Sequence, residues 1–187
     1  MIDENIRLLK LLEPTSNSLF SAKKSIKSRM NYFDDLNDIG ETFLEKNVID
    51  PLDVSIGTLS TNIYNLLLGI PVYIDFLQDI KVLNIYDCSK LLIEIKDINR
   101  FKNFSHLLSY SGFSPKKSGN QTLYQHLIKI GNKLKNNQMY SVMYSVYLDN
   151  YRNEDPFADK ETIENRATRK MIKSFLKRLY KVWKFQW

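Results

Sequence analysis

Apolar residues recur at intervals of three and four along most of this 187-residue chain, and this spacing constrains its fold more than any other feature. Such a period places apolar side chains on one face of a helix, whereas a half-buried strand requires strict alternation. In residues 31–47 the repeating side chains are Phe33, Leu36, Ile39, Phe43 and Leu44. Only 6 glycines and 5 prolines interrupt the chain. The sequence therefore predicts an all-α fold.

Turn-forming residues divide this pattern into expected helices. Pro14 should end a first helix over residues 6–12, because proline lacks the N–H that a helix interior needs. Residues 16–28 fit a loop or a helix, and residues 72–80 fit a helix or, from a short alternation, a strand. Further helices are expected at 31–47 (ended by a turn at 50–53), 60–68, 88–95 (capped by Asp87), 104–110, 122–130 and 133–151 (separated at Gly131) and 159–187. We expect a compact helical domain over residues 77–187 and an additional helical segment over residues 1–76.

The net charge of +6 is distributed unevenly along the chain. Residues 96–135 and 160–187 each carry a net charge of +7, whereas residues 1–95 carry −5 and residues 136–159 carry −3. Segregated positive charge is typical of proteins that bind a polyanion, and a solvated basic helix face is the alternative. The candidate nucleic-acid-binding residues are Arg100, Lys102, Lys116, Lys117, Ser118, Lys129, Lys133, Lys135, Arg166, Arg169, Lys170, Lys173, Lys177 and Arg178.

The residues that carry chemistry in enzymes do not cluster in this sequence. The single cysteine, Cys88, excludes a disulfide framework or a cysteine-rich zinc site, and we expect it to be a buried helix residue. The two histidines, His106 and His126, have no cysteine or acidic cluster at metal-ligand spacing. The Gly-rich phosphate loops are also missing. We therefore expect no metal, no cofactor and no catalysis by this chain alone.

The sequence also predicts a soluble, cytoplasmic protein. The longest apolar stretch, residues 63–77, is interrupted by Asn65, Gly69, Pro71 and Asp75 and is too short to span a bilayer. The first residues are acidic, whereas a signal peptide begins with basic ones.

Four fragments of the C-terminal part form an ordered set. They are LLIEIKDINRF at residues 91–101, LLSYSGFSP at 107–115, Ser118-Gly119, and IGNK at 130–133. Together they resemble the C-terminal domain of DEDD-type insertion-sequence transposases, the group that includes the Piv invertase and the bridge-RNA-guided recombinases. That pattern has Glu-Ile-Gly-Asp-Ile-x-Arg-Phe after a leucine-rich helix, then Ala-Tyr-Ala-Gly-Leu-x-Pro, a Ser-Gly in a basic loop and an Ile-x-x-x-Gly-Asn segment. The resemblance covers residues 77–187 and implies interaction with DNA, or with RNA.

The departures from this family pattern concern its chemistry. The family's catalytic carboxylates lie in an N-terminal RNase-H-like domain, and residues 1–76 have no equivalent of its opening Gly-x-Asp strand. The family's Ile-Pro-Gly-Ile-Gly hairpin corresponds to residues 80–86, which contain neither glycine nor proline. Ser118 stands at the family's nucleophile position. Without clustered carboxylates, a pair of metal ions for phosphodiester chemistry cannot be held.

Three functions fit these observations. The first is a transposase-derived DNA-binding protein that has no catalysis of its own and contacts the DNA backbone through both basic blocks. The second is a helical interaction or scaffold protein, with a homo-oligomer formed through its aromatic helix faces. The third is a recombinase subunit that uses Ser118 with a catalytic domain supplied by another chain. The aromatic residues concerned are Tyr140, Tyr144, Tyr147, Tyr151, Trp183 and Trp187.

Overall fold

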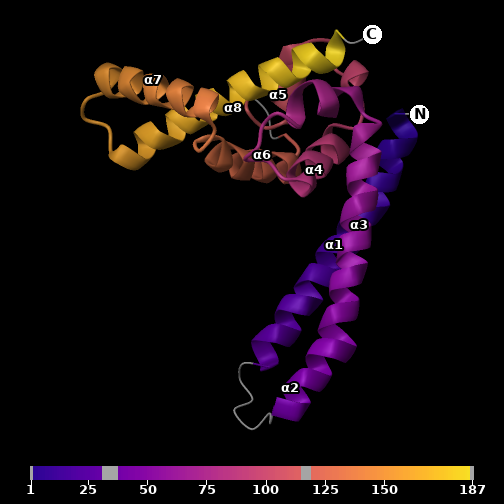
Figure 1. The fold of residues 1–187 in the computed structure, drawn as a ribbon. Coiled ribbons are helices and arrows are strands. Elements are labelled where there is room, and N and C mark those ends of the chain that lie inside the picture. Colours follow the sequence, from indigo (N-terminus) through magenta and orange to yellow (C-terminus); the bar gives the residue numbers. More distant parts are fainter. Residues whose placement is uncertain (1, 31–37, 115–118, 186–187) are drawn as a thin grey trace. The chain divides into compact units, whose positions relative to one another are not determined.

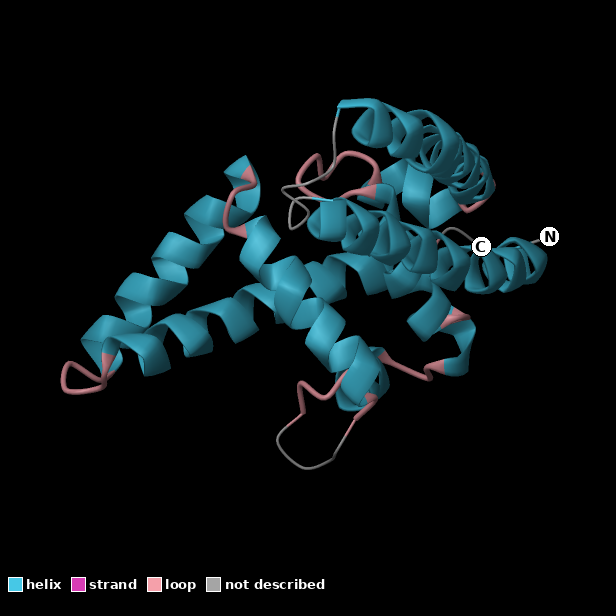
Figure 2. Cartoon of the chain, turned by 90° about the horizontal axis from the view of Figure 1, so that it is seen from below, coloured by secondary structure: helices cyan, strands magenta, loops and turns pink. Residues whose placement is uncertain are grey.

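The computed structural model describes residues 2–30, 38–114 and 119–185. In these ranges every regular element is helical, as Figures 1 and 2 show, which confirms the all-α prediction. The elements are α1 (Ile2–Met30), α2 (Asp38–Leu44), the π-helix η1 (Glu45–Ile49), α3 (Asp50–Leu68), the π-helix η2 (Tyr73–Leu77), α4 (Ile85–Ile95), the 3-10 helix η3 (Ile98–Arg100), α5 (Phe104–Tyr110), α6 (Gln121–Leu134), α7 (Gln138–Glu154) and α8 (Lys160–Lys184). The chain divides into two compact units, unit 1 (Met1–Gly69) and unit 2 (Ile70–Trp187).

Unit 1 is a hairpin in which α1 lies alongside α3 (Figure 1). The buried side of α1 includes Ile6, Leu9 and Ser16, and that of α3 includes Ile56, Ile63 and Leu67. Lys23 of α1 pairs with Asp53 of α3, and Lys27 Nζ lies 3.3 Å from Glu45 Oε1 of η1. Apolar packing therefore holds the two helices together, and exposed ion pairs add little to it.

The expected end of the first helix at Pro14 is wrong, because α1 continues through Pro14 to Met30. A proline inside a helix removes one hydrogen bond and costs about 3 kcal/mol. Leu9 and Ser16 are both fully buried on either side of Pro14. Packing along α3 outweighs the local cost of the proline, and residues 16–28 are accordingly helical.

The expected turn at residues 50–53 is also wrong. Asp50 begins α3, and Pro51 lies in its first turn, where the missing proline N–H would have no partner in any case. The part of the predicted 31–47 helix that falls on 31–37 lies outside the described residues. Of the two possibilities for residues 72–80, the helical one holds, because Tyr73–Leu77 form η2.

Unit 2 is organised around α8, which packs on α7, α6, α5, η3 and η2. The side of α8 that faces the core carries Ile163, Ala167, Met171, Phe175 and Leu179, all buried. These residues recur every four positions, which is the spacing of one helix face; Val182, three residues after Leu179, is only half-buried, and Trp183 takes the last core position. The Phe175 ring lies 5.7 Å from that of Phe76 and 6.0 Å from that of Tyr140.

Two local expectations in unit 2 need correction. The N-cap of α4 is Asn84 and not Asp87. The backbone N–H of Asp87 donates to Asn84 Oδ1 at 2.9 Å, and the backbone N–H of Asn84 donates to Asp87 Oδ2 at 3.0 Å, so the two residues form a capping box. Gly131 does not interrupt α6, which runs unbroken to Leu134. A Cβ at Gly131 would lie 2.6 Å from Ile172 Cδ1, so this glycine permits the close crossing of α6 and α8.

Candidate nucleic-acid interface

A basic stripe runs along α8 on the side away from the core. Arg166, Lys170, Lys173 and Lys177 follow one another at spacings of four, three and four residues, which places them on one helix face. Lys173 is half-buried and the other three are exposed. Among the described residues, Lys170, Lys173 and Lys177 have no ion-pair partner, so these ammonium groups are available to an anion.

Arg169 lies beside this stripe and is held in place by aromatic side chains. Its Nη1 donates a hydrogen bond of 2.7 Å to the Tyr124 hydroxyl of α6. Its guanidinium carbon lies 5.3 Å from the centre of the Phe113 ring and 5.6 Å from that of Tyr124. A planar guanidinium fixed in this way keeps its remaining N–H groups pointed in defined directions.

A depression of about 290 Å³ between α7 and α8 gathers four of the candidate cations. We call it the basic depression, and it is lined by Tyr151, Arg166, Arg169, Lys170 and Lys173. Arg166 Nη1 lies 3.2 Å from Asp155 Oδ2, but both side chains are nearly half exposed, so this pair is weak. Four cations around one concave surface match the geometry of a phosphate contact.

A second depression, of about 390 Å³, lies between α6 and α8. We call it the amide groove, and its lining residues are Tyr124, Gln125, Ile128, Asn132, Asn165, Thr168 and Arg169. Arg169 lines both depressions. Tyr124 and the amides of this surface were not predicted, because their signal in the sequence is only the helical period that places Gln125, Ile128 and Asn132 on one face.

The two basic blocks of the sequence meet along α8. Tyr124 bonds to Arg169 across 45 residues, and Lys184 Nζ donates to Asn99 Oδ1 at 3.1 Å. Lys129 on α6 and Lys102 between η3 and α5 are exposed. The fold thus brings segments of the first block against α8, the helix that forms the second block, as the hypothesis of a shared interface requires.

Other candidates in the blocks are engaged within the protein. Lys133 Nζ lies 2.6 Å from Asp87 Oδ2, and Lys135 Nζ lies 4.9 Å from the centre of the Tyr144 ring. The Arg100 guanidinium carbon lies 4.2 Å from the centre of the Tyr110 ring, and that of Arg178 lies 5.4 Å from the centre of the Phe76 ring. Their charges still contribute to the field of unit 2, but their side chains are already in contact with protein groups.

The remaining candidates, Lys116, Lys117 and Ser118, lie outside the described residues. At Gly119, which follows these residues, an added Cβ would lie 2.3 Å from the backbone nitrogen of Gly112. Asn120 donates its backbone N–H to Tyr110 O at 2.7 Å and its side-chain amide to Glu94 Oε2 at 2.7 Å. The close approach of two backbone segments therefore requires glycine at position 119.

Cys88 and His126, two residues of the types that serve catalysis or metal binding, are buried inside the protein. Cys88 is buried, and burial raises its pKa to about 12, so the nucleophilic thiolate is strongly disfavoured. His126 is buried, its Nε2 donates to Asp87 O at 2.9 Å, and burial lowers its pKa. In the part of the chain that the structure describes, no three His, Cys, Asp or Glu side chains are placed to hold a metal ion.

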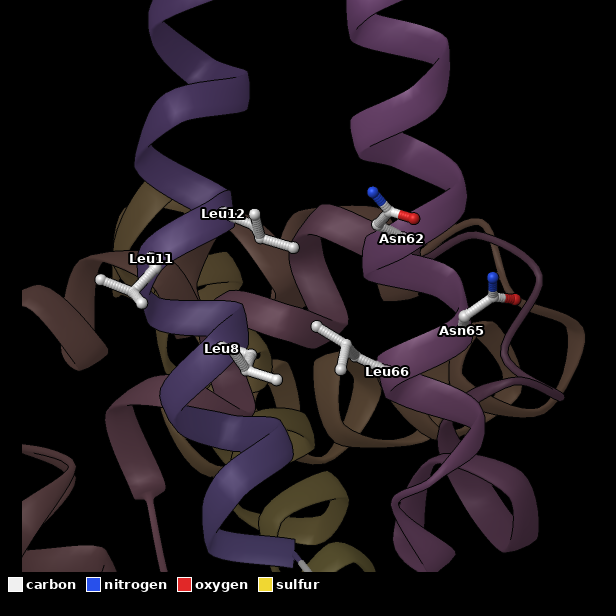
Figure 3. Close-up of a pocket in the computed structure, with 6 residues that line it drawn as sticks. All are labelled: Leu8, Leu11, Leu12, Asn62, Asn65 and Leu66. Carbon is white, nitrogen blue, oxygen red and sulfur yellow. The ribbon is translucent and has the colours of Figure 1, made fainter.

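Unit 1 has a groove of a different character between α1 and α3. It measures about 350 Å³, and Figure 3 shows the leucines of α1 opposite the residues of α3 that line it. The lining residues are Leu8, Leu11, Leu12, Asn62, Asn65 and Leu66. None of these side chains carries a charge, so this groove lacks the cations of the basic depression.

The four tyrosines of α7 do not form an exposed stacking platform. Tyr140 is buried and the other three are half-buried, and the Tyr147 hydroxyl lies 2.9 Å from Ser174 Oγ of α8. These rings are therefore partly or wholly covered by the packing of unit 2 and are not free to stack on bases. Among the described residues, no helix is long and apolar enough to span a membrane.

Comparison with known proteins gives one match. No curated protein and no solved structure matches the chain significantly. A family model described as Transposase IS116/IS110/IS902 family matches residues 75–156, a range that begins within η2 and contains α4, η3, α5, α6 and α7. This match confirms that residues 75–156 resemble insertion-sequence transposases, as the sequence fragments of the C-terminal part indicated.

Proposed function

We propose that unit 2 binds DNA by its phosphate backbone, through the basic depression and the adjoining stripe of α8, without a catalytic step of its own. The observation that carries this proposal is the convergence of Arg166, Arg169, Lys170 and Lys173 on one concave surface. The match of residues 75–156 to a transposase family supports it, because transposases act on DNA. Unit 2 holds 20 basic and 11 acidic residues, whereas unit 1 holds 7 and 10, so DNA should be drawn to unit 2.

Contacts to phosphates predict a steep dependence of affinity on salt. Each phosphate neutralised on duplex DNA contributes about −0.9 to the slope of log affinity against log salt concentration. Reversing Lys170, Lys173 and Lys177 to glutamate removes three such contacts, so the slope should flatten by about 2.7. Fluorescence anisotropy with unrelated labelled duplexes measures this slope, and the loss should be the same for every sequence.

The matched control reverses Lys10, Lys24 and Lys46, three exposed lysines of unit 1, to glutamate. It changes the net charge by the same amount, so it should leave the slope nearly unchanged if the interface is local. Equal effects of the two triple variants, or binding that does not respond to salt, would contradict the proposal. The interaction-protein hypothesis would then be the better description.

Strand cleavage needs its own test, because the resemblance places Ser118 at a nucleophile position. The purified chain should leave supercoiled DNA intact in the presence of magnesium or manganese, with no covalent protein–DNA adduct. An adduct that is lost in Ser118→Ala would instead establish the recombinase-subunit hypothesis.

A further inference from the structure

We propose that the amide groove between α6 and α8 holds one unpaired nucleobase, next to a phosphate bound in the basic depression. This inference rests on the proposed function and makes it more specific: unit 2 would recognise a single-stranded or locally unpaired segment. It comes from the adjacency of two depressions of different chemistry, one lined by cations and one by amides, that share Arg169.

The volume of the groove suits a single nucleobase. Its volume of about 390 Å³ lies in the range of small-molecule sites, about 300–1,000 Å³. It lies between two helices that cross closely at Gly131 and Ile172, so its walls are fixed by core packing. A depression of this volume can hold one unpaired base, whereas the stacked pairs of a duplex are too large to enter it.

The lining of the groove supplies the chemistry that reads a base. Thr168 is buried and Ile128 is half-buried, which gives an inner surface that is partly apolar, whereas the amides of Gln125, Asn132 and Asn165 are exposed. A side-chain amide offers a donor and an acceptor together, as base edges do, and paired amide contacts discriminate adenine from other bases. Among the described residues, none of these three amides is engaged in a side-chain hydrogen bond, so each has both groups to offer.

Arg169 links the two depressions. Its bond to Tyr124 and its stacking on Phe113 fix it on the boundary between amides and lysines. A strand whose base enters the amide groove therefore has its neighbouring phosphate beside Arg169, Lys170 and Lys173. Consecutive nucleotides carry a phosphate and a base in this same alternation, which is why a nucleic acid strand fits the pair of depressions.

The experiment measures the affinity of the full chain for labelled dA, dC and dT single strands of equal length and for the dA·dT duplex, by fluorescence anisotropy at several salt concentrations. The test variant is the double substitution Asn132→Ala and Asn165→Ala, which removes one amide from each helix. The matched control is Asn62→Ala and Asn65→Ala, two exposed asparagines of α3 in unit 1. A third variant, Lys170→Ala with Lys173→Ala, tests the phosphate contact.

We expect wild-type protein to prefer one homopolymer and to bind it more tightly than the duplex. The amide variant should weaken binding to the preferred strand by about 5- to 150-fold, the effect of one lost bidentate base contact, with the salt slope unchanged. The lysine variant should flatten the slope by about 1.4 on every single strand and keep the base preference. The control should match wild type.

Equal affinity of wild type for all three strands, or an amide variant that behaves as the control does, would overturn the inference. Salt-dependent binding to strands and duplex alike, without base preference, would leave the proposed function standing and refute only the base site. Failure of wild type to bind any of these nucleic acids would refute both proposals.

Discussion

Substitution of Lys96 by glycine should stabilise unit 2. Among the described residues, Lys96 is the one non-glycine residue with a positive φ, at φ 62° and ψ −75°. These angles, with a 2.8 Å hydrogen bond from the backbone N–H of Asp97 to Ile95 O, describe a classical γ-turn, which is rare and strained for residues that carry a Cβ. The transposase pattern that this segment resembles has glycine at the same position, directly after Glu-Ile.

The size of the effect follows from two opposing terms. A residue with a side chain in a sparsely populated backbone conformation costs about 1–3 kcal/mol. Glycine removes that cost but loses about 0.5–1 kcal/mol through the greater freedom of the unfolded chain. Lys96 is exposed, so its side chain contributes little packing. We therefore expect Lys96→Gly to raise the free energy of unfolding by about 1 kcal/mol, or the melting temperature by about 4 °C.

Urea unfolding followed by tryptophan fluorescence measures this change for unit 2 alone, because both tryptophans, Trp183 and Trp187, belong to it. The control is Lys102→Gly, an exposed lysine of the next loop without a positive φ, which should lower stability by up to about 1 kcal/mol. If Lys96→Gly destabilises unit 2 as much as Lys102→Gly does, the γ-turn carries no strain and this reasoning is refuted.

Three further predictions concern the packing of unit 2 and are tested by the same measurement. Gly119→Ala should lower stability by about 1–3 kcal/mol, because its Cβ would lie 2.6 Å from a backbone carbonyl oxygen; wild-type stability would show that the segment moves freely. Tyr140→Phe should be neutral or stabilising, since the buried Tyr140 hydroxyl has no hydrogen-bond partner among the described residues, whereas Tyr147→Phe should cost about 1 kcal/mol; the reverse order would contradict the two assignments. Burial lowers the pKa of His126 below its ordinary 6.5, so the unfolded state binds the proton more tightly than the folded state does. The contribution of neutral His126 to the free energy of unfolding should be fully present above pH 6.5 and should be lost as the pH drops through the lower pKa of the folded state. His126→Gln should reduce this pH dependence.

Local sequence was sufficient for features that depend on neighbouring residues. The helical class followed from apolar spacing, since a period of 3.6 residues leaves a strand with no continuous apolar face. The helix at Phe104–Tyr110 was predicted with its observed bounds, because Asn103 and the Gly112 turn mark its ends within the sequence. Burial of Cys88 and the core face of α8 followed from the same spacing.

Tertiary structure decided the features for which a distant segment changes the local balance. Pro14 and Gly131 both look like helix ends, yet α1 and α6 continue through them because α3 and α8 supply packing that exceeds the local cost. The candidate site is of the same kind: charge segregation identified Lys170 and Lys173, but the position of Arg169 depends on Tyr124, 45 residues earlier in the chain. Spacing along a helix reveals which side chains share a face, whereas the groove between α6 and α8 exists only because two such faces meet, and that meeting is fixed by the packing of the whole core.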